Sequence, residues 1–369
     1  MNATAESRVK GLDGLRGVAI LAVLFSHLTV YEGSAWLTNL AELGSRGVDL
    51  FFALSGYLIF ERLQHVRNQP GWLQDFWLRR AAKIVPVYAF VLLGVYVVLP
   101  PLLGLTGFST KPAAQIGVLG DWPWYATFTS NVLNIREGRF LNPAIDVAWS
   151  LAVEVQFYLL ATLAFVVRRN GGPKSFWLLL ALFALLVRLA AVAAGFNWIQ
   201  ILACTPARLD AFIAGIALVF SRSRLPRWLQ ILGLGGLAMC ALPPWSREGL
   251  WGMTIGYSWV ALGCAVLIDL ARQPAATHFC SRVLTGRFLC IVGALSYTLY
   301  LVHVPIRAAL RDLLLPPERI LDSTGAWLNQ GLFYAGAGLI CLLCAALGWC
   351  WIEKPVRRWM LRTRAELRL

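Results

Sequence analysis

Charged residues are scarce in this chain of 369 residues. They make up 14% of the sequence, against about 25% in soluble domains, and 58% of the sequence is apolar. A chain this apolar cannot cover itself with the polar surface of a soluble globular domain, so the composition excludes that class. It predicts instead a polytopic membrane protein whose backbone groups are satisfied within helices.

Acidic residues are the least abundant charged class, with 19 Asp and Glu against 33 Lys and Arg. The net charge of +14 does not point to nucleic acid, because membrane proteins collect basic residues on cytoplasmic loops. No D-x-D-like loop is present, and the C-x-x-C formed by Cys341 and Cys344 has no second pair or histidine near it. We therefore expect neither a nucleic-acid partner nor a bound metal.

Apolar runs of spanning length predict an all-α, polytopic transmembrane helix bundle. We expect a single integral-membrane domain over 1–369, with no fused soluble domain and no cleaved signal peptide. The ten predicted spans are 12–30, 48–66, 84–103, 149–167, 176–196, 206–221, 227–243, 250–270, 287–306 and 331–352.

Basic residues between these runs predict the orientation. With the N-terminus in the cytoplasm, 23 of the 33 lysines and arginines fall on inner segments, 9 fall on outer segments, and Arg188 falls within a span. This asymmetry favours an even number of spans with both the N-terminus and the C-terminus cytoplasmic.

Ionisable residues are expensive at membrane depth and mark functional sites. At 1.5 Å per residue, His27 lies about 16 Å beyond Arg16, in the outer half of the first span. Glu154 lies roughly 7 Å below the outer surface on a descending helix, so the two share a level. The other polar residues predicted near this outer level, as acceptor-binding or supporting groups, are Asp49, Ser55, Trp149, Ser150, Arg208, Asp210, Tyr300 and His303.

His27 has two interpretations. It could be a histidine hydrogen-bonded between helices, or a general base whose tautomer and basicity are set by a carboxylate. Glu154 at matching depth favours the second, which suits removal of a proton from an acceptor hydroxyl during group transfer.

Two further segments allow two interpretations each. Arg79, Arg80 and Lys83 at the inner start of the third span suit a phosphate-bearing ligand or ordinary positive-inside anchoring. The aromatic-rich outer segment 104–148 suits an interfacial belt or stacking on sugar rings.

Six motifs in order along the chain resemble the membrane-bound acyltransferase-3 family, which includes bacterial O-antigen, exopolysaccharide and Nod-factor O-acetyltransferases. They are Arg16 and His27 separated by ten residues, "GVDLFFALSGYLI", "RRAAKIVPVY", "WSLAVEVQFY", and the closing "SYTLYLVHVPI" with "EKPVRR". Lys83 stands where the family usually has arginine, which leaves a point charge instead of a planar fork.

The resemblance implies a multi-pass enzyme of the bacterial inner membrane that takes an acyl group, usually acetyl, from cytoplasmic acyl-CoA. The acceptor it implies is a hydroxyl of a cell-envelope carbohydrate. By the same resemblance His27 would be the catalytic base, and Glu154 would orient it or bind the acceptor. Arg16, Arg79, Arg80 and Lys83 would bind the donor. Some members carry a fused outer SGNH-type domain, so the expected chain either acylates the acceptor itself or passes the group to a partner.

Three alternatives remain open at this point. The same centre could acylate a small molecule such as a macrolide or antibiotic sugar. Polar residues at one depth could also belong to a transporter of a polar or acidic solute, although no internal repeat is visible. A lipid-linked sugar transferase is the third, against which the missing D-x-D-like loop speaks.

Overall fold

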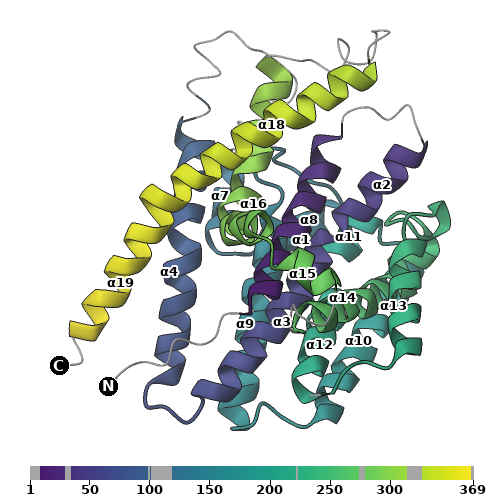
Figure 1. The fold of residues 1–369 in the computed structure, drawn as a ribbon, viewed down its shortest axis with the longest axis vertical. Coiled ribbons are helices and arrows are strands. Elements are labelled where there is room, and N and C mark those ends of the chain that lie inside the picture. Colours follow the sequence, from purple (N-terminus) through teal and green to yellow (C-terminus); the bar gives the residue numbers. More distant parts are fainter. Residues whose placement is uncertain are drawn as a thin grey trace.

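The computed structural model describes residues 9–29, 35–98, 100, 119–221, 223–273, 279–313 and 326–366. Within these ranges all regular secondary structure is helical and there is no β-strand, so the all-α prediction is confirmed. Figure 1 shows the helices gathered into one bundle, with α1 (Lys10–Leu28) near its centre.

The remaining helices fall into long and short groups. The long ones are α3 (Gly47–Val66), α4 (Trp72–Leu93), α9 (Ala148–Val167), α10 (Lys174–Ala193), α14 (Tyr257–Ala271), α16 (Arg287–Leu313) and α18 (Ala326–Gly348). The shorter ones are α2 (Ala35–Ser45), α7 (Trp122–Ala126), α8 (Ser130–Glu137), α11 (Trp198–Ala203), α12 (Leu209–Phe220), α13 (Arg227–Met239), α15 (Phe279–Leu284) and α19 (Lys354–Glu366). Single 3₁₀ or π turns complete the list: η1 (Gly94–Val98), η2 (Leu119–Asp121), η3 (Pro206–Arg208), η4 (Pro243–Trp245), η5 (Gly252–Gly256) and η6 (Trp349–Glu353).

Eight helical segments in the described ranges are long and apolar enough to cross a membrane. The spans predicted at 206–221 and 227–243 are also helical, but α12 has 12 residues and α13 has 13. At 1.5 Å per residue these reach roughly 18–20 Å, short of a hydrocarbon core of about 30 Å. The chain is thus a multi-pass helical membrane protein, and the count of ten spans stays a prediction.

Glycines bring the central helices into backbone contact. A Cβ added at Gly293 of α16 would lie 1.8 Å from the carbonyl oxygen of Asp13 in α1. A Cβ at Gly56 of α3 would lie 1.9 Å from the carbonyl oxygen of Phe212 in α12. Only glycine permits such approaches, which are typical of helix packing in membranes. The first pair places α16 directly against α1.

Stacked aromatic rings hold α3, α9 and α12 together. The ring centre of Phe212 lies 4.1 Å from that of Phe157 and 4.7 Å from that of Phe52. Trp149 packs edge-on against Phe52 at 6.1 Å and is buried. These rings form the interior wall beside the cavity described below, so Trp149 serves the core and does not line the cavity.

The last helices of the described chain form one long continuous rod. In Figure 1, α18, η6 and α19 run on as a single yellow rod, and α19 lies beside α4. On α10, by contrast, Leu178 and Leu179 are 70% and 64% exposed. Apolar side chains facing outward over a spanning helix are what contact with lipid requires.

Candidate active site

A partly open cavity lies between five helices, α1, α3, α4, α9 and α16. Most of its wall is apolar, and its polar groups come from widely separated segments of the chain. The lining residues that carry polar groups are Arg16, Ser55, Lys83, Ser150, Glu154, Ser296, Tyr297 and Tyr300.

Cations gather at one end of this cavity. Arg16 and Lys83 line it, and both interact electrostatically with Arg80. The Arg80 guanidinium lies over the ring of Tyr158, 5.7 Å from its centre. Arg79 is exposed and lies outside the lining residues. Three of the four predicted donor-binding cations therefore come together.

Glu154 stands in the middle of the cavity wall and accepts two hydroxyl hydrogen bonds. Ser55 of α3 donates one, and Tyr158, one turn along α9, donates the other at 2.5 Å. These contacts, rather than one to His27, are its partners among the described residues. The described residues therefore show no direct contact of Glu154 with His27. That Glu154 orients His27 or binds the acceptor stays a prediction.

Tyr300 and Ser150 also line the cavity and contact each other. Their hydroxyls lie 2.7 Å apart, and the Tyr300 hydroxyl also donates to the backbone carbonyl of Val147 at 3.1 Å. The Tyr300 ring centre is 5.7 Å from that of His303. Tyr300 thus stands between the cavity and the histidines.

His27 contacts a second histidine. Its Nδ1 lies 2.7 Å from Nε2 of His303, and Nδ1 of His303 lies 3.2 Å from the carbonyl oxygen of Leu299. His303 is fully buried and His27 half-buried. Both were predicted from sequence at one level, but their contact was not.

Three side chains secure the end of α1 next to this pair. Arg307 Nη1 donates to the carbonyl of His27 at 2.9 Å, and Gln330 Nε2 donates to the carbonyl of Leu28 at 3.0 Å. Thr29 donates to the carbonyl of Phe25 at 2.7 Å. The last carbonyls of a helix lack partners within the helix, so these bonds hold His27 firmly against α16 and α18.

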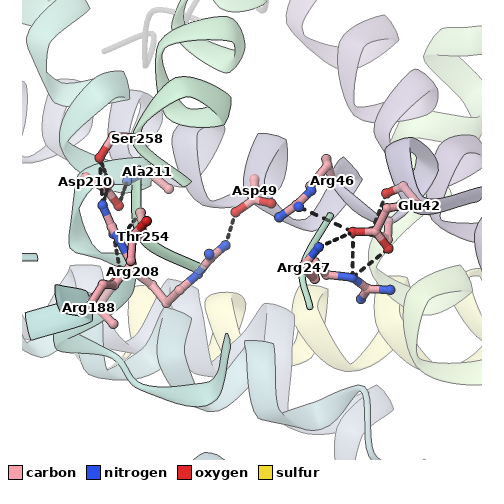
Figure 2. A network of polar contacts seen from close by, with 12 residues as sticks. Glu42, Arg46, Asp49, Arg188, Arg208, Asp210, Ala211, Arg247, Thr254 and Ser258 are labelled. Atoms are coloured by element: carbon pink, nitrogen blue, oxygen red, sulfur yellow. Dashed lines mark hydrogen bonds and ion pairs between the residues drawn. The ribbon is translucent and has the colours of Figure 1, made fainter. Parts of the chain in front are cut away.

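A buried ion-pair network outside the cavity lining contains Asp49, Arg208 and Asp210 (Figure 2). Arg208 Nη2 binds Asp49, and Arg188 Nη2 binds Asp210 at 2.8 Å. Arg188 also donates to the carbonyls of Thr254 and Ala207. The two carboxylates, Asp49 and Asp210, thus compensate arginines that cannot shed their charge. The acceptor-binding or supporting role of Asp49, Arg208 and Asp210 stays a prediction.

The network continues toward the surface. Figure 2 shows Asp49 between Arg208 and Arg46, and Glu42 between Arg46 and Arg247. Arg46 Nη2 lies 3.3 Å from Glu42, and Arg247 Nε lies 3.0 Å from the other oxygen of Glu42. α2, which carries Glu42, was not predicted as a helix. The network joins it to α3 and to the segment before α14.

Sequence reasoning also missed the role of Glu353. Its carboxylate is buried and accepts a hydrogen bond from Thr298 at 2.8 Å, and it interacts electrostatically with Lys83. In the sequence, Glu353 stands directly before the basic run "KPVRR". The apolar "WCWI" before Glu353 is the signal that could have placed it inside.

One carboxylate outside the spans is perturbed by its surroundings. Asp146, two residues before α9, accepts hydrogen bonds from the Tyr125 hydroxyl at 3.2 Å and the Asn142 amide at 3.0 Å. Burial raises the pKa of Asp146 to about 7 despite these bonds. The aspartate is therefore partly protonated at neutral pH, next to the segment that holds Ser150 and Val147.

The fold and cavity define a helical membrane protein with a cationic inner pocket, a central carboxylate and a histidine pair. Residues 9–350 match the model of an acyltransferase domain, acyltransferase-3. The chain belongs to this family. The predicted resemblance is confirmed.

Relatives extend beyond this chain. It is 28% identical to the O-acetyltransferase OatA of Staphylococcus aureus over 375 residues, which are 94% of this chain and 57% of the relative. It is 28% identical to the peptidoglycan O-acetyltransferase OatA of Listeria monocytogenes over 386 residues, 95% of this chain and 56% of the relative. The chain thus spans little more than half the length of these relatives. No solved structure matches it.

Proposed function

We propose that this acyltransferase moves an acetyl group from acetyl-CoA to a hydroxyl of a cell-envelope carbohydrate, with His27 as the general base. One observation carries the proposal. A single cavity is lined by the cations Arg16 and Lys83 and also by Tyr300, which lies next to the histidine pair. A donor with a charged head and a long thin arm fits such a space.

The cationic end suits the donor's phosphates. Arg16 and Lys83 line the cavity, and Arg80 lies close by. Guanidinium and ammonium groups both bind phosphate. The proposed orientation, with both termini and this end of the cavity in the cytoplasm, agrees with the basic residues of the inner loops.

His27 takes the acceptor's proton in the proposed reaction. The acceptor oxygen bonds to the thioester carbonyl carbon, and its proton passes to His27. The carbon–sulfur bond then breaks, and the CoA sulfur leaves with the proton that His27 returns. A base with a pKa near operating pH contributes about 10²–10⁴-fold to such a step.

A carbohydrate acceptor is supported by the relatives, one of which is named for the O-acetylation of peptidoglycan. We propose an envelope polysaccharide of this class as the acceptor, reached from the outer side of the cytoplasmic membrane. The resting position of Tyr300, between cavity and histidines, means that it also contacts the arriving thioester.

The test is acetyl transfer by purified protein in lipid nanodiscs, with labelled acetyl-CoA and cell-envelope glycans. His27→Ala should lose transfer by at least about 10²-fold and keep wild-type thermal unfolding. His65→Ala is the matched control, since His65 is an exposed histidine that hydrogen-bonds to the Glu61 carbonyl one turn earlier in its own helix. An active His27→Ala enzyme would refute the base assignment, and no use of acetyl-CoA by wild type would refute the donor.

A further inference from the structure

We infer that His303 fixes the tautomer of His27 and leaves its Nε2 as the atom that takes the proton. This rests on the proposed function, since it concerns the base of that reaction. His303 is a positioning residue here, because it acts through His27.

The two imidazoles lie edge to edge. Their planes differ by 10°, their centres are 5.0 Å apart, and the nearest nitrogens are 2.7 Å apart. Parallel rings in face-to-face contact would be separated by roughly 3.5 Å or more, so nitrogens at 2.7 Å exclude that arrangement. The rings are nearly coplanar, which is the geometry of an N–H···N hydrogen bond within the ring plane.

Backbone chemistry decides the direction of this bond. A carbonyl oxygen only accepts hydrogen bonds, so the Nδ1 of His303 that faces Leu299 must carry its proton. In neutral His303 the remaining nitrogen, Nε2, is then an acceptor. The bond at 2.7 Å therefore has His27 Nδ1 as its donor. That leaves Nε2 of His27 with its lone pair free.

Packing prevents the alternative arrangement. His303 is fully buried within α16, and Arg307 and Gln330 fix the carbonyls at the end of α1. When His27 takes a proton on Nε2, its Nδ1–H becomes a charge-assisted donor to His303, which strengthens the bond. His303 thus does for His27 what a carboxylate does in a catalytic triad, without adding negative charge.

The direct test is nitrogen NMR of the wild-type protein in nanodiscs with labelled histidine. The chain has four histidines, so His27→Ala assigns the signal of His27 by its loss. A proton on Nδ1 of neutral His27 is expected. A proton on Nε2 would overturn the inference. The tautomer itself is read from the wild-type protein, and His27→Ala serves only to assign the signal.

Two substitutions extend the test to catalysis. His303→Gln keeps an oxygen that can accept from His27 Nδ1–H, whereas His303→Leu keeps the volume and removes the acceptor. We expect His303→Leu to lose about 10–100-fold in kcat/KM, with a shifted pH profile and unchanged KM for acetyl-CoA, and His303→Gln to recover most of the loss. Wild-type activity and pH profile in His303→Leu would overturn the inference, while an active His27→Ala would instead refute the proposed base.

Discussion

The substitution Gly293→Ala tests whether backbone contact between α1 and α16 sets the geometry of the histidine pair. The added Cβ would lie 1.8 Å from the Asp13 carbonyl oxygen and 3.0 Å from the Gly17 nitrogen. Ordinary contact begins at 3.4 Å, so about 1.6 Å of space is missing. Both neighbours are backbone atoms, and no side chain can rotate away. The helices themselves must separate or slide.

This separation of α1 and α16 is larger than the hydrogen bond between the two histidines can tolerate. The nitrogens of His27 and His303 are 2.7 Å apart, and a displacement of roughly 1 Å would take them beyond hydrogen-bond distance. Misplacing a catalytic group by about 1 Å costs roughly 10²-fold in rate. Overpacking at a tight interface costs typically about 1–3 kcal/mol of stability. Gly293→Ala should therefore show both losses, measured as kcat/KM for acetyl transfer and as thermal unfolding in nanodiscs.

Gly336→Ala is the matched control. Gly336 lies on α18, is exposed, and has no atom within 4 Å of an added Cβ. Alanine favours a helix over glycine by about 1 kcal/mol, so this variant should be as active and at least as stable as wild type. If Gly293→Ala matched Gly336→Ala in both assays, close packing of α1 on α16 would not be what holds the two histidines together.

Three further predictions concern the polar groups. Glu154→Ala should unfold at a lower temperature than Glu154→Gln, because the amide oxygen still accepts a hydroxyl bond and an orphaned buried hydroxyl costs about 1–3 kcal/mol; identical unfolding of the two would contradict this contact. Asp49→Asn should lower the free energy of unfolding by about 3–5 kcal/mol, because it leaves the Arg208 charge uncompensated. Arg136→Gln should lower it by only about 0–1 kcal/mol, because Arg136 belongs to a surface ion pair and its side chain is 60% exposed. Asp146 has a folded pKa of about 7, above its unfolded value of about 3.9. The contribution of Asp146 to the free energy of unfolding should therefore be fully present below about pH 4 and be lost as pH rises through 7. Asp146→Asn should remove this pH dependence in thermal unfolding scans.

The depth of each polar residue in the membrane was predictable from sequence. The side of the helix that faces its neighbours, and so the partner of each side chain, was not. Charge asymmetry and a rise of 1.5 Å per residue place His27, Glu154 and His303 in one half of the bundle. Which of them touch depends on the rotation and tilt of each helix, and these are set by contacts such as Gly293 against Asp13. A span that is apolar on all sides has no hydrophobic periodicity, so its sequence does not predict how the helix is rotated.

The ion-pair network shows a second limit of the same kind. Arg188 was the one basic residue predicted inside a span, and that prediction alone required a buried acidic partner. Asp210 supplies it at 2.8 Å. The sequence offered several carboxylates at the outer level, so their assignment to a catalytic site or to structural arginines needed the three-dimensional arrangement.

The buried ion-pair network is separate from the polar groups that line the cavity, and this separation has a chemical consequence. Asp49 and Asp210 are engaged by arginines outside the cavity, so Glu154 is the one carboxylate among the described residues that line it. In the proposed reaction, an anionic donor that enters past Arg16 and Lys83 would therefore meet only one carboxylate, Glu154, before its neutral thioester reached Tyr300. Charges in a low-dielectric space interact strongly, and a further carboxylate beside the base would repel the oxyanion that forms on the attacked carbonyl. A base oriented by a neutral histidine avoids that repulsion, which is a physical reason for His303, rather than an aspartate or glutamate, to stand behind His27.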